Sequence, residues 1–228
     1  MHHSRFAFLA GASALAANAA AAGAAPIKLD EPSKCPVVSA AEAQQRLVYG
    51  NERFVTQTMA HPEQTVERRK NTASVGQCPW ALVLTCSDSR VPADVVFDRG
   101  LGDLFVARTA GNVIDPIVIG SLQYARVHYH TNLLVVLGHE KCGAVEATLA
   151  WMQGATPPPP PFILSVTEAI KPAINTGMTV EEAVKANATY VAQRLRIPPD
   201  LRKMRVVPAY YTMSTGRVTY LPEPRSAG

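Results

Sequence analysis

Trp80-Ala81-Leu82-Val83-Leu84-Thr85 is an unbroken, mainly apolar run that ends at Cys86. A second run, Leu133-Leu134-Val135-Val136-Leu137-Gly138, ends at His139 in the same manner. Short apolar runs of this kind are typical of strands that are buried on both faces of a parallel sheet. The sequence therefore predicts that Cys86 and His139 lie at the carboxyl ends of two parallel strands, where open α/β sheets usually bind ligands.

Helix signals alternate with the predicted strands. Asp115 can cap, and Pro116 can begin, a helix that runs to about Val127, and Gly143 leads into a helix over 144–152. A third strand is expected at 104–107 and a fourth at 205–207 together with 209–211, with a closing hairpin over 211–220. The alternation predicts an α/β fold: a mainly parallel central sheet of four strands, a C-terminal antiparallel edge strand, flanking helices and an N-terminal helical arm.

Two capping-box patterns predict where other helices begin. Ser39 with Glu42 predicts a helix from about residue 40, and Thr179 with Glu182 predicts a second. The charged and irregular segment 61–76 is interpreted as a surface connection.

The composition fits one ordinary globular domain. The chain has 228 residues, of which 47% are hydrophobic and 18% charged, so it can bury a substantial core. We place the domain at 39–222, followed by a tail over 223–228. The formal net charge is +4, and the basic residues are scattered among acidic ones, so the sequence gives no support for a nucleic-acid partner.

Residues 1–24 form a separate compositional zone. Arg5 precedes an apolar, alanine-rich stretch that contains Ala22-Gly23-Ala24, which fits the cleavage site of an export signal peptide. Residues 25–38 would then be a linker or arm. The alternative is an uncleaved membrane anchor, which is disfavoured because alanine and glycine contribute little transfer free energy. The sequence therefore predicts an exported, periplasmic protein that is free of the membrane after cleavage.

The four cysteines divide into two pairs by their surroundings. Cys35 and Cys78 each precede a proline in loop-like sequence, and in an oxidising compartment they could form a disulfide. Cys86 and Cys142 lie close to polar residues and, with His139, give two sulfur ligands and one nitrogen ligand. Catalytic zinc sites use this set and leave the fourth position for water. We therefore expect one zinc ion per chain at Cys86, His139 and Cys142.

Longer motifs around these ligands resemble the β-class carbonic anhydrases, in particular the plant-like members with an accessible metal site. The motifs are Cys86-Ser87-Asp88-Ser89-Arg90, Leu104-Phe105-Val106-Ala107-Arg108-Thr109-Ala110-Gly111-Asn112 and Gly138-His139-Glu140-Lys141-Cys142-Gly143-Ala144. The likeness extends from about Leu47 to Leu221. It implies reversible hydration of CO2 to bicarbonate by attack of zinc-bound hydroxide. It also implies a homodimer or higher homo-oligomer, with the substrate pocket across a subunit interface.

The resemblance implies roles for further residues. Arg90 would hold Asp88 ionised, so that its carboxylate accepts the proton of zinc-bound hydroxide. In this family the same carboxylate can instead bind zinc at low pH. The pocket for CO2 would be lined by Gln77, Phe105, Ala110 and Tyr124. Val83 stands where members with a noncatalytic bicarbonate pocket usually have tryptophan, so that form of regulation is disfavoured.

Two alternatives to a carbonic anhydrase stay open from the sequence. One is a hydrolase of carbonyl sulfide or carbon disulfide on the same scaffold, since the same hydroxide can attack those carbons. The other is a noncatalytic zinc module for assembly, with Cys35 or Cys78 as a fourth ligand. The residues Asp88, Arg90 and Gln77 argue against the module, because a closed structural site needs no such surroundings.

Overall fold

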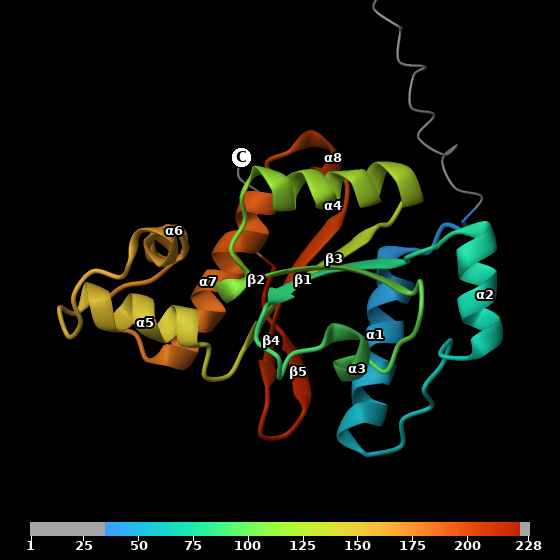
Figure 1. The fold of residues 1–228 in the computed structure, drawn as a ribbon, viewed down its shortest axis with the longest axis horizontal. Helices are drawn as coiled ribbons and strands as arrows, with labels where there is room; N and C mark the ends of the chain where they lie inside the picture. The colour runs from blue at the N-terminus through green and yellow to red at the C-terminus, as the bar shows by residue number, and fades with distance from the viewer. Residues whose placement is uncertain (1–34, 224–228) are drawn as a thin grey trace, which may run out of the picture.

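Five strands form one sheet in the order β2-β1-β3-β4-β5 within residues 35–223, the part of the chain that the computed structural model describes (Figure 1). The strands are β1 (Ala81–Cys86), β2 (Leu104–Thr109), β3 (Leu133–His139), β4 (Arg205–Thr212) and β5 (Arg217–Tyr220). The first four pair in parallel, and β5 pairs antiparallel with β4. The predicted α/β class, with its C-terminal antiparallel edge strand, is confirmed.

Helices cover both faces of the sheet and the edge formed by its carboxyl ends. They are α1 (Ala40–Val55), α2 (Val66–Val75), α3 (Ala93–Val96), α4 (Pro116–Tyr129), α5 (Gly143–Met152), α6 (Pro161–Ile170), α7 (Val180–Leu195) and α8 (Pro199–Arg202), with the 3-10 turns η1 (Ala110–Asn112) and η2 (Lys171–Ala173). Side chains of α1 and α3 pack on one face, and those of α4, α7 and α8 pack on the other. Helices α5 and α6 lie to one side of the sheet in Figure 1, where they contribute to a third cluster with Cys86 and Cys142.

The burial of β1 explains its unbroken apolar sequence. Ala81 and Val83 belong to the core under α1, whereas Leu82 and Leu84 belong to the core under α4 and α7. All six residues of β1 and all seven of β3 are buried. Both faces of these strands are covered. Their sequences therefore lack the alternation of polar and apolar residues that is typical of a half-exposed strand.

The predicted helix starts are confirmed, with one difference. Asp115 accepts a hydrogen bond from the amide of Val118, and Thr179 with Glu182 forms the full capping box. Ser39 caps α1 by accepting from the amide of Glu42. The carboxylate of Glu42, however, pairs with Arg46 one turn further along α1, so the reciprocal half of the predicted box is replaced by an ion pair.

Segment 61–76, expected as a surface connection, contains a helix that was not predicted. Residues Val66–Val75 form α2, whose first turn is capped by the side chain of Thr65. No residue of α2 is buried, so this helix has no apolar stripe by which its sequence could have been recognised. The helices α3 and α8, of four residues each, were likewise not predicted.

The structure joins Cys35 to Cys78 in a disulfide, which confirms the pairing expected of the two cysteines outside the metal motifs. This bond ties the segment before α1 to the segment before β1 across 43 residues of sequence. Neither cysteine is therefore available as a fourth ligand to a metal at Cys86. The noncatalytic zinc module considered above would need that ligand.

The predicted signal peptide at 1–24 lies outside the described residues, as do most of the linker over 25–38 and most of the tail over 223–228. Among residues 35–223, the helices are all too short or too polar to span a membrane.

Asp98, just after α3, anchors α1 and the segment that follows it. Its side chain is fully buried, and its carboxylate accepts hydrogen bonds from Arg53 Nε at 2.5 Å and from the amides of Ala60 and His61 at 2.9 and 3.0 Å. Burial alone would raise the pKa of Asp98, but these three donors outweigh it and hold the pKa below its ordinary value. The ionised carboxylate therefore stabilises the fold.

We predict that Asp98→Asn lowers the free energy of unfolding by about 3 kcal/mol at pH 7, because it leaves the partly buried charge of Arg53 uncompensated. A depressed pKa stabilises the folded state above the unfolded pKa of about 3.9, and this contribution is lost as the pH falls through the folded value. The deficit of the variant should thus shrink in acid. Urea denaturation of both proteins from pH 7 to pH 3, at equal protein concentration, measures this.

The matched control is Asp200→Asn, because Asp200 is exposed and its nearest ion-pair partner, Lys203, is 4.0 Å away. That change should alter stability by less than about 0.5 kcal/mol. A deficit for Asp98→Asn that stays constant down to pH 3 would contradict the assigned role of the charge.

Candidate metal centre

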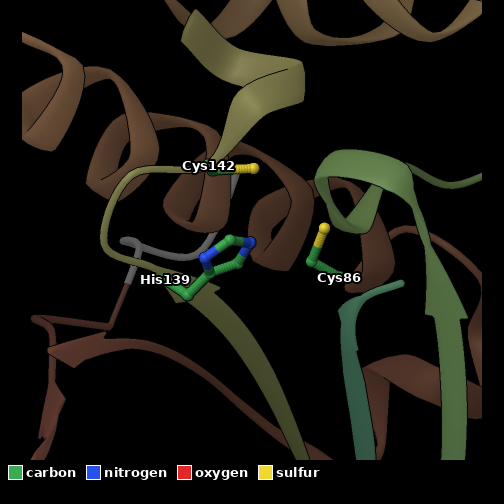
Figure 2. Close-up of side chains that lie close together, drawn as sticks. All are labelled: Cys86, His139 and Cys142. Carbon is green, nitrogen blue, oxygen red and sulfur yellow. The ribbon is translucent and has the colours of Figure 1, made fainter. Parts of the chain in front are cut away.

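Three predicted ligands meet at the carboxyl end of the sheet. The sulfur atoms of Cys86 and Cys142 and a ring nitrogen of His139 all lie within 4.8 Å of one another, and all three residues are buried. In Figure 2 both sulfur atoms and one imidazole nitrogen face a common space. The predicted convergence of these side chains is therefore confirmed, although Cys86 and His139 are 53 residues apart in sequence.

The backbone explains how these residues meet. Cys86 and His139 are the last residues of the adjacent parallel strands β1 and β3. Lys141 has a left-handed φ of 52°, which turns the chain back after β3 so that Cys142 becomes the N-cap of α5. Two strand ends and one helix start thus supply the three ligand atoms.

The hydrogen bonds of His139 leave one ring nitrogen for a metal. Nδ1 lies 2.9 Å from the backbone oxygen of Glu140, which fixes Nδ1 as the donor in a neutral imidazole. Nε2 is buried and has no hydrogen-bond partner among the described residues. A buried acceptor that faces two sulfur atoms fits a zinc ion, since Cys2His is a ligand set of catalytic zinc.

The contact between the two thiols moves their pKa values in opposite directions. The pKa of Cys86 is lowered well below its ordinary value, mainly because Cys142 donates a hydrogen bond to it, with help from the amide of Gly111. The pKa of Cys142 is raised for the converse reason, and burial raises it further. Cys86 is therefore a thiolate at neutral pH, the form that binds metals.

Position 111, beside the Cys86 thiolate, requires glycine because of its backbone conformation and its tight packing. Its amide lies 3.3 Å from Cys86 Sγ, and its φ of 66° is left-handed. A Cβ at this position would come within 2.7 Å of Ile170 Cδ1. The carbonyl of Gly111 also accepts a hydrogen bond from the buried amide of Asn187 in α7, at 2.9 Å. Sequence reasoning did not single out Gly111 or Asn187, although Gly111 lies within one of the quoted motifs.

Asp88 and Arg90 form a bidentate pair beside the ligands. Arg90 Nε lies 2.9 Å from Asp88 Oδ1 and Arg90 Nη2 lies 2.7 Å from Oδ2, and the amide of Arg90 donates to Oδ1 as well. These hydrogen bonds lower the pKa of Asp88 far below its ordinary value, against the effect of burial. The carboxylate is therefore ionised and held in one orientation at neutral pH.

Arg108, which was not predicted, fixes the backbone of the same loop. Its guanidinium donates to the carbonyl of Cys86 at 3.1 Å and to the carbonyl of Asp88 at 2.6 Å. The side chain thus bridges the end of β2 to the loop after β1. Its place in the Leu104–Asn112 motif was visible in the sequence, but its contacts were not.

Of the four predicted pocket residues, only one lies beside the metal ligands of its own chain. Ala110 lies next to Gly111, beside Cys86. Phe105, in contrast, pairs with Leu82, which is four residues and roughly 13 Å before the end of β1. The side chains of Gln77, Phe105 and Tyr124 instead gather around Tyr129.

The fold and the site thus define an α/β protein with a buried Cys2His site and an adjoining carboxylate–guanidinium pair. The family model described as carbonic anhydrase matches residues 81–218, and the chain belongs to this family. The solved structures of similar fold place it in the β class.

Individual relatives agree with that assignment. Carbonic anhydrase 2 of Mycobacterium tuberculosis is 45% identical over 142 residues, which is 62% of this chain and 68% of that protein. A carbonic anhydrase of Mycolicibacterium smegmatis is 47% identical over 128 residues, 56% of this chain and 61% of that protein.

Two solved structures show the same fold. The β-carbonic anhydrase CcaA is 25% identical with a TM-score of 0.59, over 78% of this chain and 95% of its own. A structure from a study of two tetrameric β-carbonic anhydrases of Sordaria macrospora is 19% identical with a TM-score of 0.62, over 78% of this chain and 96% of its own.

We predict that Cys86→Ser weakens zinc binding by at least about 100-fold, since it removes a ligand and not only a residue that orients one. The double variant Cys35→Ser with Cys78→Ser makes the same chemical change away from the ligands and should retain one zinc per chain. Metal analysis of the purified proteins after dialysis against a weak chelator measures both. Full zinc occupancy in Cys86→Ser would contradict the ligand assignment.

Proposed function

We propose that this protein is a zinc-dependent carbonic anhydrase that interconverts CO2 and bicarbonate. One observation carries the proposal: three buried ligand atoms face a common space directly beside an ionised carboxylate that Arg90 holds in place. A zinc ion bound there would supply hydroxide near neutral pH, because zinc lowers the pKa of water at its fourth position.

Asp88 is proposed as the residue that orients the nucleophile. Its ionised carboxylate can accept a hydrogen bond from the attacking hydroxyl group, which directs a lone pair of that oxygen toward the carbon of CO2. Arg90 engages both carboxylate oxygens, and Arg108 holds the backbone carbonyl of Asp88, so the carboxylate has little freedom to rotate. This restriction is the main contribution of the chain's own residues, apart from the ligands.

The substrate pocket is proposed to form only in a homodimer or larger homo-oligomer. Gln77, Phe105 and Tyr124 lie away from the ligands of their own chain, so a second copy would have to bring them to its partner's metal centre. Helix α4 supports such contact, because three large apolar side chains on it are exposed: Ile117, Tyr124 and Val127. Exposed apolar area of this kind favours association.

Export to the periplasm is also proposed. The predicted signal peptide over 1–24 motivates it, and the disulfide between Cys35 and Cys78 supports it, because disulfides persist in oxidising compartments. Bicarbonate supply or acid buffering would suit such an enzyme.

We predict that Asp88→Asn keeps zinc and lowers kcat/KM for CO2 hydration by about 100-fold or more, because an amide no longer acts as a charged proton acceptor. Stopped-flow hydration measured with the zinc content of the same sample tests this. The control is Asp200→Asn, a surface change that should leave the rate within about twofold. An unchanged rate in Asp88→Asn would refute the role of Asp88. Sulfide release from carbonyl sulfide without CO2 hydration in the unsubstituted enzyme would instead favour the hydrolase.

A further inference from the structure

Gln77 is tied to a residue that the sequence did not single out. Its amide Nε2 donates a hydrogen bond to the hydroxyl oxygen of Tyr129, at 3.0 Å. Gln77 precedes β1, whereas Tyr129 is the last residue of α4, 52 positions later. One of the two amide hydrogens is used in this bond, so the other hydrogen and Oε1 stay available to a ligand.

Tyr129 is well suited to hold this amide in place. Its ring meets His128 edge to face at a centroid distance of 4.8 Å and Tyr124 at 6.0 Å, and it lies 6.4 Å from the ring of Phe105. It also packs against the buried cluster of α4 and α7. Aromatic contacts of this kind restrict the ring, so its hydroxyl is presented at a fixed point.

The backbone of Gln77 is held on its C-terminal side. Cys78 is bonded to Cys35, whose Sγ also lies 3.5 Å from the carbonyl oxygen of Gln77. The carbonyl of Pro79 accepts a hydrogen bond from Thr131 Oγ1 at 2.8 Å. On the N-terminal side stands Gly76, the C-cap of α2, whose φ of 89° is left-handed and whose amide donates to the carbonyl of Thr72 at 3.0 Å.

We propose that Tyr129 is a positioning residue for Gln77, and that the Cys35–Cys78 disulfide fixes the backbone from which Gln77 projects. Gln77 is exposed, and a free glutamine side chain loses up to about 2 kcal/mol of rotamer entropy when it is ordered. If it is ordered before substrate binds, that cost is not borne during the reaction. The inference rests on the proposed function, in which Gln77 contacts the substrate.

The test compares Tyr129→Phe with Tyr49→Phe in the zinc-loaded, full-length enzyme. Tyr129→Phe keeps the ring and removes only the hydroxyl. Tyr49 is a matched control, because its hydroxyl accepts an equivalent hydrogen bond from Gln45 Nε2 at 2.9 Å on the exposed side of α1. We expect kcat/KM for CO2 hydration to fall about 3- to 10-fold in Tyr129→Phe, the range that one net hydrogen bond gives, and to stay within about twofold in Tyr49→Phe.

A double-mutant cycle separates positioning from a general structural role. In a Gln77→Ala background, Tyr129→Phe should change kcat/KM by less than about 1.5-fold, because the side chain that it orients is gone. The double variant Cys35→Ser with Cys78→Ser should behave likewise, with a loss only when Gln77 is present. This second arm keeps the inference testable if Tyr129→Phe folds poorly. Zinc content and oligomeric state are measured for every variant.

Three outcomes would overturn the inference while leaving the proposed hydration of CO2 at the zinc site intact: no loss in Tyr129→Phe, an equal loss with and without Gln77, or full activity in Gln77→Ala itself. A zinc-loaded unsubstituted enzyme that does not hydrate CO2 would overturn the proposed function, and the inference with it. The two failures are therefore distinguished by the unsubstituted enzyme alone.

Discussion

The pairing of β1 with β3 is the constraint on which the site depends. Thr85 lies opposite Leu137 in this parallel ladder, so both strands end at the same edge of the sheet, one at Cys86 and the other at His139. Parallel strands must be buried on both faces, and the apolar clusters under α1 and under α4 and α7 provide that burial. The packing energy of the whole sheet thus holds two ligands beside each other before any metal binds.

Electrostatics around this edge follow from the same geometry. The negative charge of the Cys86 thiolate is stabilised by donors from Cys142 and from the amide of Gly111, and Asp88 by the guanidinium of Arg90. Two anionic groups can therefore stand close together at neutral pH, one to bind a cation and the other to accept a hydrogen bond. Arg108 links both, since it donates to the carbonyls of Cys86 and Asp88.

Much of this site could be predicted because its signals are local in sequence. The apolar run of β1, the spacing of His139 and Cys142, and the Asp88–Arg90 pair are each contained in a few consecutive residues. The features that were not predicted either involve contacts between residues far apart in sequence or belong to segments without buried residues. Helix α2 has no apolar stripe, and the bond between Gln77 and Tyr129 joins residues 52 apart. For the residues implied for the pocket, only the structure separates Gln77 and Phe105 from the ligands of their own chain.

The central claim is that Cys86, His139 and Cys142 hold a catalytic zinc and leave room for substrate chemistry. It is tested most directly by measuring CO2 hydration and zinc content on one sample of the unsubstituted protein, with zinc K-edge absorption to count the ligands. We expect one zinc per chain with two sulfur ligands, one imidazole and one light exchangeable ligand, together with CO2 hydration. Three sulfur ligands with no exchangeable position, or full zinc content without hydration, would contradict it.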